Sequence, residues 1–155
     1  MTARAPVFKT IGLFGKYGDA RIGPVIAGLL EFLHGRGLTV ILEEATAGAL
    51  DLTAVKSRPI AGIGREIDLA VVVGGDGTML SVARHLADFG VPMIGINLGR
   101  RGFLTDIPVD DPFPVLARIL DGDFQTEERI LLAAEVVRGD RTEEVRVSQQ
   151  ILQSL

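Results

Sequence analysis

The sequence predicts an α/β fold in which a parallel β-sheet carries helices on both of its faces. Apolar runs alternate with amphipathic segments, the runs are almost free of polar residues, and glycines follow most of them. Alternating strands and helices are typical of parallel strands joined by crossover helices. Strands that are apolar on both sides fit a sheet that is covered on both faces. Because 47% of the residues are hydrophobic but only 5% are aromatic, the core should be aliphatic.

The first part of the chain contributes two strands and one clear helix. Residues 6–15 predict a strand that ends in glycine, and residues 19–37 predict a helix whose apolar residues recur every three or four positions. Residues 38–44 predict a short buried strand. From residue 45 to 64 the pattern weakens and Pro59 interrupts it, so we expect a loop with at most a short helix.

The middle of the chain repeats this alternation with stronger signals. Residues 67–75 predict the clearest strand of all, residues 78–90 a helix, and residues 91–99 another strand. The order of these elements supports crossover connections between parallel strands.

The last part of the chain breaks the alternation. Residues 110–123 predict a helix that Asp110 or Asp111 could cap. Residues 130–148 then predict two strands joined by a turn near Gly139. An isolated hairpin is marginal in water, so this pair of strands should belong to a second, β-rich unit.

Composition excludes several classes of function. The net charge is −4 and no block of Lys or Arg stands out, which argues against a nucleic-acid partner. The chain has no cysteine and only two histidines, so we expect no disulfide, no thiol catalysis and no histidine-based metal site. No apolar run approaches membrane-spanning length, and the first residues lack a signal-peptide pattern. We therefore expect a cytoplasmic protein with no membrane partner.

Three glycine-rich segments lie at the ends of predicted strands. They cover residues 12–18, 74–77 and 95–102. Ligands of open parallel sheets bind outside the carboxyl ends of the strands. We expect all three segments to line one crevice there.

The string GGDGT, Gly74 to Thr78, follows the clearest predicted strand and opens a helix. Glycine lets a phosphate approach the main chain, and a helix N-terminus adds unpaired N–H donors. Thr78 could cap the helix or donate its hydroxyl to a phosphate oxygen. The motif favours a phosphate-binding turn.

Asp76 does not fit a simple phosphate-binding turn, because a carboxylate repels phosphate. It could hold Mg²⁺ that bridges phosphates, or accept a proton from a hydroxyl that attacks a phosphoryl group. It could also simply cap the helix. The complete five-residue motif between a strand and a helix favours a functional role over a turn alone.

Other phosphate-binding and nucleophile motifs are absent from the sequence. There is no Walker A loop, no Gly-x-Gly-x-x-Gly fingerprint and no Gly-x-Ser-x-Gly elbow. Lys16 and Arg21 follow the first strand and could reach an anion, but a solvated surface role is favoured for both. The same holds for His34 and His85, the latter one helix away from the crevice.

Two strings carry a family resemblance. GGDGTML, residues 74–80, and INLGRRGFLTD, residues 96–106, together resemble the NAD kinase family, and IGLFGK is similar to the first strand of that family. Diacylglycerol and sphingosine kinases and ATP-dependent phosphofructokinases carry close variants of GGDGT, but the second string separates NAD kinases from them. The resemblance covers residues 6–147 in order and spacing. It implies a Rossmann-like fold of the NAD kinase and phosphofructokinase type.

The resemblance also implies a reaction. NAD kinases transfer a phosphoryl group from ATP, or from polyphosphate in some members, to the 2′-hydroxyl of the adenosine ribose of NAD⁺, and they need a divalent metal such as Mg²⁺. Asp76 matches the catalytic proton acceptor, and Gly77 matches a neighbouring glycine that contacts NAD. Phe103 matches an aromatic residue that packs near the adenine, for which a core position is the alternative.

The other residues of the implied site surround these three. Asn97 could hold its loop through side-chain bonds to the backbone, and Arg100 and Arg101 could meet a pyrophosphate. The complete set of candidate cofactor-binding residues is Gly74, Gly75, Asp76, Gly77, Thr78, Asn97 and Phe103, with Asp76 as the catalytic residue and no metal ligand.

The sequence departs from the family in length. NAD kinases are longer and carry a second, all-β domain whose Asn-Glu or Asn-Asp pair grips the ribose. We assign residues 1–125 to an α/β nucleotide-binding domain and residues 126–155 to a hairpin that begins the all-β domain. We therefore expect an incomplete NAD kinase. We also expect a homo-oligomer or aggregation through the unpartnered hairpin, residues 130–147, with disorder of this segment as the alternative. The alternatives are an inactive nucleotide-binding or assembly fragment, and another GGDGT kinase that acts on a lipid or a sugar phosphate.

Overall fold

The structure, a computed structural model, describes residues 7–100, 102–130, 134–139, 141–145 and 149–153. One sheet has the strand order β3-β2-β1-β4-β5-β10-β7, with β6 also paired to β5, and β8 and β9 form a separate hairpin. The strands are β1 (Thr10–Gly15), β2 (Thr39–Glu43), β3 (Ser57–Arg58), β4 (Leu69–Gly74), β5 (Met93–Asn97), β6 (Ile107–Pro108), β7 (Gln125–Arg129), β8 (Ala134–Arg138), β9 (Arg141–Val145) and β10 (Gln149–Gln153). The helices are α1 (Ile22–Gly35), α2 (Glu44–Ala49), α3 (Ile60–Ile63), α4 (Asp76–Leu86) and α5 (Phe113–Leu120), with the 3₁₀-helix η1 (Ala87–Phe89) after α4.

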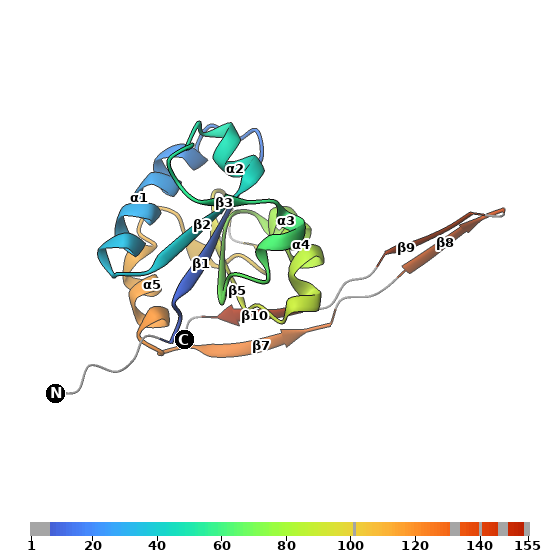
Figure 1. Ribbon diagram of the computed structural model, residues 1–155. Helices are drawn as coiled ribbons and strands as arrows, with labels where there is room; N and C mark the ends of the chain where they lie inside the picture. The colour runs from blue at the N-terminus through green and yellow to red at the C-terminus, as the bar shows by residue number, and fades with distance from the viewer. Residues whose placement is uncertain (1–6, 101, 131–133, 140, 146–148, 154–155) are drawn as a thin grey trace.

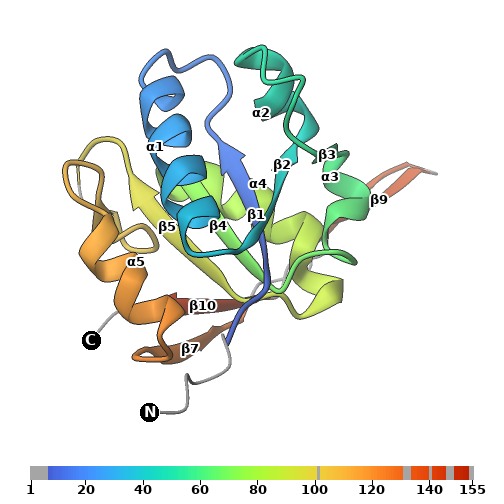
Figure 2. The same ribbon diagram turned by 60° about the vertical axis from the view of Figure 1, so that its left-hand side comes forward.

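The sheet is parallel from β3 to β5, as the sequence predicts. β1 lies between β2 and β4, and β4 pairs with β5, in each case in the parallel sense. The helices cover both faces, with α1 and α5 on one side and α3 and α4 on the other (Figures 1 and 2). The predicted α/β, Rossmann-like architecture is confirmed.

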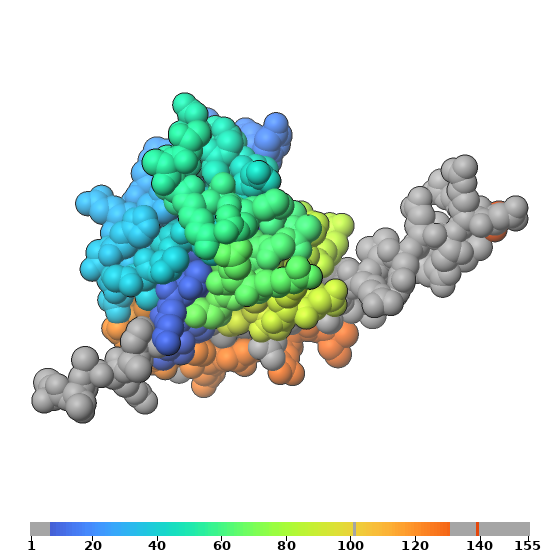
Figure 3. Space-filling model, viewed as in Figure 1, coloured from blue at the N-terminus to red at the C-terminus, as the bar shows by residue number. Residues whose placement is uncertain are grey.

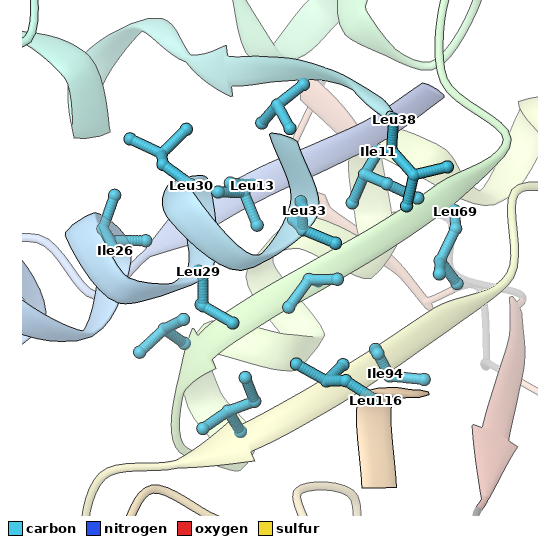
Figure 4. Close-up of a cluster of buried hydrophobic side chains, with 14 of the residues drawn as sticks. Ile11, Leu13, Ile26, Leu29, Leu30, Leu33, Leu38, Leu69, Ile94 and Leu116 are labelled. Carbon is cyan, nitrogen blue, oxygen red and sulfur yellow. The ribbon is translucent and has the colours of Figure 1, made fainter. Parts of the chain in front are cut away.

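The core is aliphatic and divided by the sheet into two layers. On one face, the α1 residues Ile26, Leu29 and Leu33 point towards Ile11 and Leu13 of β1 (Figure 4), and all five side chains are fully buried. On the other face, α3 and α4 bury their own apolar residues against β4 and β5. Each such Leu or Ile side chain contributes about 1.5–3 kcal/mol through burial. The two layers together hold the strand ends in fixed positions.

The segment 45–64 contains more regular structure than the sequence predicts. Glu43 caps α2 with its side chain, whose two oxygens accept hydrogen bonds from the backbone N–H groups of Ala45 and Thr46, both at 2.9 Å. Short β3 and α3 follow, with Pro59 as the N-cap of α3. These elements are too short for a hydrophobic period to reveal, because β3 has two residues and α3 four.

Two predicted helix caps are wrong. Neither Asp110 nor Asp111 caps α5, whose N-cap is Pro112 and has no side-chain hydrogen bond. Thr78 does not cap α4, because this helix already begins at Asp76. The helix can begin there because Gly75, its N-cap, has an extended backbone that turns directly from the strand into the helix.

The last part of the chain extends the main sheet as well as forming a hairpin. β10 runs parallel to β5, and β7 pairs with β10 in the antiparallel sense at the outer edge of the sheet. The exposed edge strand β7, QTEER, lies along the lower side of the molecule in the space-filling view (Figure 3). Charged residues on an edge strand discourage pairing with other chains.

The predicted hairpin is confirmed as β8 and β9. They pair from Ala134 with Val145 to Arg138 with Arg141, and Gly139 in the turn between them has a φ of 62°. Within the segment 130–147, residues 131–133, 140, 146 and 147 lie outside the described residues. The division into two domains at residue 125 stays a prediction. None of the helices in the described segments is long and apolar enough to cross a membrane.

Candidate functional site

The carboxyl ends of β1, β4 and β5 meet at one edge of the sheet. Gly74 at the end of β4 is the register partner of Asn97 at the end of β5. Backbone bonds continue past the strands, from the Leu98 N–H to the Gly74 carbonyl at 3.0 Å and from the Lys16 N–H to the Val73 carbonyl at 2.9 Å. Three connections that are far apart in sequence therefore start side by side.

The turn from β4 into α4 needs glycine for two different reasons. A Cβ atom on Gly74 would lie 2.5 Å from the Thr78 hydroxyl, so only glycine fits beneath that side chain. A Cβ atom on Gly75 or Gly77 would meet nothing within 4 Å. Gly74 is therefore required by packing, whereas Gly75 and Gly77 leave open space in front of the helix N-terminus.

The Asp76 carboxylate is held by a turn from a distant part of the chain. Its Oδ2 accepts a hydrogen bond from the Phe103 N–H at 2.9 Å, and its Oδ1 accepts one from the Leu104 N–H at 3.0 Å. The N–H and the hydroxyl of Thr105 both donate to Oδ1, each at 3.2 Å. A Cβ atom on Gly102 would lie 2.2 Å from Oδ1, so glycine allows this close approach. The interpretation of Asp76 as a helix cap is wrong, because its carboxylate bonds to this turn and not to its own helix.

The charge of Asp76 is stabilised without a cation. Partial burial alone would raise its pKa, but the hydrogen bonds from Phe103, Leu104 and Thr105 outweigh burial and hold the pKa below its usual value. No ion pair joins Asp76 to a described Lys, Arg or His, and no group of three or more His, Cys, Asp or Glu among the described residues could hold a metal ion. The site therefore presents an ionised carboxylate whose charge no cation among the described residues neutralises.

Asn97 holds the loop that follows β5. Its side chain is 94% buried, since only 6% of the residue is exposed. The amide nitrogen donates to the carbonyls of Arg100 and Thr105, and the amide oxygen accepts from the Gly99 N–H at 2.8 Å. The side-chain bonds to the backbone that the sequence predicts are present. Arg101 lies outside the described residues.

Phe103 is 90% exposed although its backbone N–H binds Asp76. The alternative interpretation of Phe103 as a core residue is therefore wrong. A large, exposed aromatic side chain on the turn that holds the carboxylate offers a flat apolar face to a ligand.

A cleft of about 690 Å³ opens next to the head of α4. It is lined by Phe14, Gly15, Lys16, Tyr17, Glu43, Ala45, Ile60, Gly75, Gly77, Thr78, Ser81, Val82 and His85. Two of the three glycine-rich segments thus line the cleft. The described residues of the third, 95–100 and 102, do not line it, which corrects the expectation of one crevice lined by all three. The third segment is packed instead, because Thr105 occupies the space beside Gly95 and Asn97 is buried. Asp76 itself faces the turn at 102–105 while its neighbours on both sides face the cleft.

Two cleft residues on α4, Ser81 and Val82, were not singled out from the sequence. They recur with Thr78 and His85 at three and four residues, so all four share one face of α4. This spacing was the available signal for them. His85, for which the sequence favours a surface role, also lines the cleft, and its Nδ1 lies 2.9 Å from the Ser81 carbonyl oxygen. Tyr17, 82% exposed, had no such signal because it lies in an irregular loop.

Arg21 has a structural role that goes beyond the solvated surface role favoured by the sequence. Its guanidinium donates to the Leu98 carbonyl at 2.9 Å and pairs with Asp19 at 2.7 Å. It therefore ties the first loop to the connection after β5. Lys16, by contrast, lines the cleft.

A family model described as the ATP-NAD kinase N-terminal domain matches residues 11–124. The chain belongs to the NAD kinase family. The match includes the parallel strands from β1 to β6, the GGDGT turn and the turn at 102–105, but not β7 and β10. The contacts of Asp76 and Asn97 described above therefore lie within the matched part.

Relatives and solved structures of NAD kinases agree with this assignment. The chain is 48% identical over 132 residues to an NAD kinase of Thiobacillus denitrificans and 49% identical over 136 residues to one of Bordetella avium. The matches cover 85% and 86% of this chain but 46% and 44% of those relatives, so the chain spans about half their length.

Two solved structures share the fold. A yeast NADH kinase complexed with NADH matches 93% of this chain and 46% of its own, with a TM-score of 0.67 and 18% identity. An NAD kinase from Archaeoglobus fulgidus in complex with ATP matches 86% and 45%, with a TM-score of 0.57 and 21% identity. At these identities the likeness concerns the fold alone.

Proposed function

We propose that this chain is the nucleotide-binding and catalytic part of an NAD kinase, which transfers the γ-phosphoryl group of ATP to the 2′-hydroxyl of the adenosine ribose of NAD⁺. The single observation that carries the proposal is the Asp76 carboxylate, ionised, free of any ion pair with a described cation and fixed at the head of α4 beside an open cleft. The products are NADP⁺ and ADP.

Asp76 accepts the proton of the attacking hydroxyl in this proposal. The ribose oxygen forms a bond to the γ-phosphorus while the bond from that phosphorus to the bridging oxygen of ADP breaks. A lowered pKa makes Asp76 a weak base, but it ensures that the carboxylate is ionised at neutral pH. Phosphoryl transfer has a loose transition state, for which orientation of the hydroxyl counts for more than base strength.

The remaining candidate residues serve binding. Gly75, Gly77 and Thr78 face the cleft at the N-terminus of α4, where unpaired N–H groups and the positive end of the helix dipole favour phosphate. Phe103 is free to stack on the adenine of NAD⁺, a contact worth about 0.5–1.5 kcal/mol beyond area burial. Gly74 and Asn97 act by shaping the turn and the loop on which these groups stand.

The described residues do not form a metal site of their own. Most of the acceptor capacity of Asp76 Oδ1 is already used by N–H and O–H donors. We therefore infer that Mg²⁺ enters as its complex with ATP, where it neutralises phosphate charge.

Nucleotide binding without turnover is the second candidate for the chain taken by itself. The observation that favours it is length, because the chain covers only 46% and 44% of the two relatives. A surface that holds the NAD⁺ ribose from the other side would come from the part that the match does not cover.

The test uses the chain alone and a chimera in which it replaces the matching segment of the Bordetella avium relative. NADP⁺ formation from NAD⁺, ATP and Mg²⁺ is followed by a coupled NADP-dependent dehydrogenase, and NAD⁺ and ATP binding to the chain alone by calorimetry. We expect turnover by the chimera, abolished by EDTA, and binding by the chain alone. A folded chimera that forms no NADP⁺, or that phosphorylates a lipid or sugar phosphate instead, would contradict the proposal.

A homo-oligomer, a cytoplasmic location and the absence of nucleic-acid and membrane partners stay predictions from the sequence. The first is tested by size-exclusion chromatography with light scattering. We expect a dimer or larger species, and a monomer that resists concentration would contradict it.

A further inference from the structure

The fully buried Thr105 connects every part of the turn that holds Asp76. Its N–H and its hydroxyl each donate to Asp76 Oδ1 at 3.2 Å. Its carbonyl accepts from the Gly102 N–H and from the Asn97 amide nitrogen, both at 3.2 Å. All of its polar groups are thus committed, two to the carboxylate and one to the scaffold.

The two carboxylate oxygens of Asp76 accept different numbers of hydrogen bonds. From the described residues, Oδ1 accepts three hydrogen bonds, one from Leu104 and two from Thr105, whereas Oδ2 accepts one, from Phe103. Each carboxylate oxygen has two lone pairs. Oδ1 is therefore saturated, and Oδ2 keeps a free acceptor position.

We propose that Thr105 is a positioning residue of the phosphoryl transfer, which occupies Oδ1 so that Oδ2 is the oxygen that takes the proton. The inference rests on the proposed function. The 2′-hydroxyl proton passes to Oδ2 as the ribose oxygen bonds to the γ-phosphorus, and ADP leaves with the electrons of the broken P–O bond. The protonated Asp76 then returns its proton to water.

The packing around Thr105 explains why threonine suits this position. A Cβ atom on Gly95 of β5 would lie 2.5 Å from the Thr105 methyl group, so the strand is shaped to receive that methyl. Because the Thr105 carbonyl is also held by the buried Asn97, the side chain cannot turn away without breaking these contacts. The hydroxyl is aimed at Asp76 by the fold and not by the carboxylate alone.

Other ionisable groups lie on the elements packed around this turn. Lys16, Glu43 and His85 line the cleft, Asp106 follows Thr105, and Arg100 precedes the turn. None of these described side chains forms an ion pair with Asp76. A change in the Asp76 titration on substitution of Thr105 would therefore report the lost hydrogen bond, provided that the fold is unchanged.

The first experiment needs no activity. The Asp76 carboxyl carbon of the chain is titrated by ¹³C NMR in the wild type, in Thr105→Val, which keeps the shape but loses the hydroxyl, and in Thr105→Ser, which restores it. We expect the Asp76 titration to move to higher pH in Thr105→Val and to return in Thr105→Ser. Thr46→Val is the matched control, since Thr46 is 3% exposed and its hydroxyl binds Glu43 and the Gly15 N–H. It should lose comparable stability and leave the Asp76 titration unmoved.

The second experiment measures kinetics in the chimera. Thr105→Val should lower kcat about tenfold, with KM for NAD⁺ within about twofold, and move the acidic limb of the pH profile upwards. Thr105→Ser should recover most of kcat. An active wild type together with a folded Thr105→Val of unchanged kcat and pH profile overturns this inference and leaves the proposed function standing. A wild-type chimera without NADP⁺ formation overturns the proposed function and this inference with it.

Discussion

Asp19 and Asp76 both follow a strand of the parallel sheet, and both have a lowered pKa, but for different reasons. Asp19 lies in the loop after β1, where the guanidinium and then the backbone N–H of Arg21 hold its pKa far below the usual range. Lys16 adds a second cation at 3.7 Å. Asp76 is held by the N–H and O–H donors of a turn that lies 27 to 29 positions further along the chain.

The difference concerns what each carboxylate can do next. The charge of Asp19 is cancelled by cations of its own loop, so it serves to shape that loop and to orient Arg21 towards the Leu98 carbonyl. The charge of Asp76 is stabilised by dipoles but not cancelled. Neutral donors can be rigid and leave the negative charge in place, which is the condition for receiving a proton or facing a substrate hydroxyl.

The comparison of Asp19 with Asp76 predicts that the largest effect of a substitution is on kcat. In the chimera, Asp76→Asn should lower kcat by about 10²–10⁴-fold, because the amide cannot accept the hydroxyl proton. Asp19→Asn should change kcat by less than about threefold, since the charge of Asp19 is paired with Arg21 and Lys16 and Asp19 is not among the residues that line the cleft. Both are read from initial rates of NADP⁺ formation.

Circular dichroism of both variants supplies the control for folding. If Asp76→Asn were folded and as active as the wild type, the carboxylate would have no part in proton transfer. Equal losses in the two variants would mean that the contrast between cancelled and uncancelled charge is not what matters.

A second prediction compares the stability effects of substitutions in the turn at 102–105 and in the loop that precedes it. Gly102→Ala would place a methyl group 2.2 Å from Asp76 Oδ1, so the turn must shift, at a cost of about 1–3 kcal/mol in the free energy of unfolding. The methyl group of Gly99→Ala would meet only the Asn97 side-chain oxygen, at 4.0 Å. This variant should therefore change the free energy of unfolding by about 0.5 kcal/mol or less. Urea denaturation of the chain measures both. Similar urea midpoints for the two variants would show that the turn does not contact Asp76 closely at Gly102.

The fold was predictable because its signals are local and repeated. The strand at 67–75 became β4 with every residue buried, and the helix at 19–37 became α1 with its apolar residues facing the sheet. What the sequence did not reveal was β7, because an exposed strand with the sequence QTEER has no apolar run to mark it. Its position depends on pairing with β10, a contact between distant segments.

The candidate site residues follow from motifs in the sequence, but the contacts between them do not. GGDGT marked Asp76, yet nothing in the sequence indicated that its partners would be the amides of Phe103, Leu104 and Thr105. Backbone donors leave no trace in side-chain identity. The one clue was Gly102, whose lack of a side chain permits the approach of the turn to the carboxylate.

The smallest predicted effect lies in acid stability. Because the folded pKa of Asp76 is below its unfolded value, the carboxylate stabilises the folded state fully above the unfolded pKa, near pH 4, and this contribution is lost as the pH falls through the folded pKa. The asparagine variant lacks a group that titrates there. The Tm of Asp76→Asn should therefore lie below that of the wild type at pH 7, and the gap should narrow towards pH 3, as measured by circular dichroism. A gap that stays constant over this range would mean that the hydrogen bonds from the turn do not favour the ionised carboxylate, and the contrast with Asp19 would lose its physical basis.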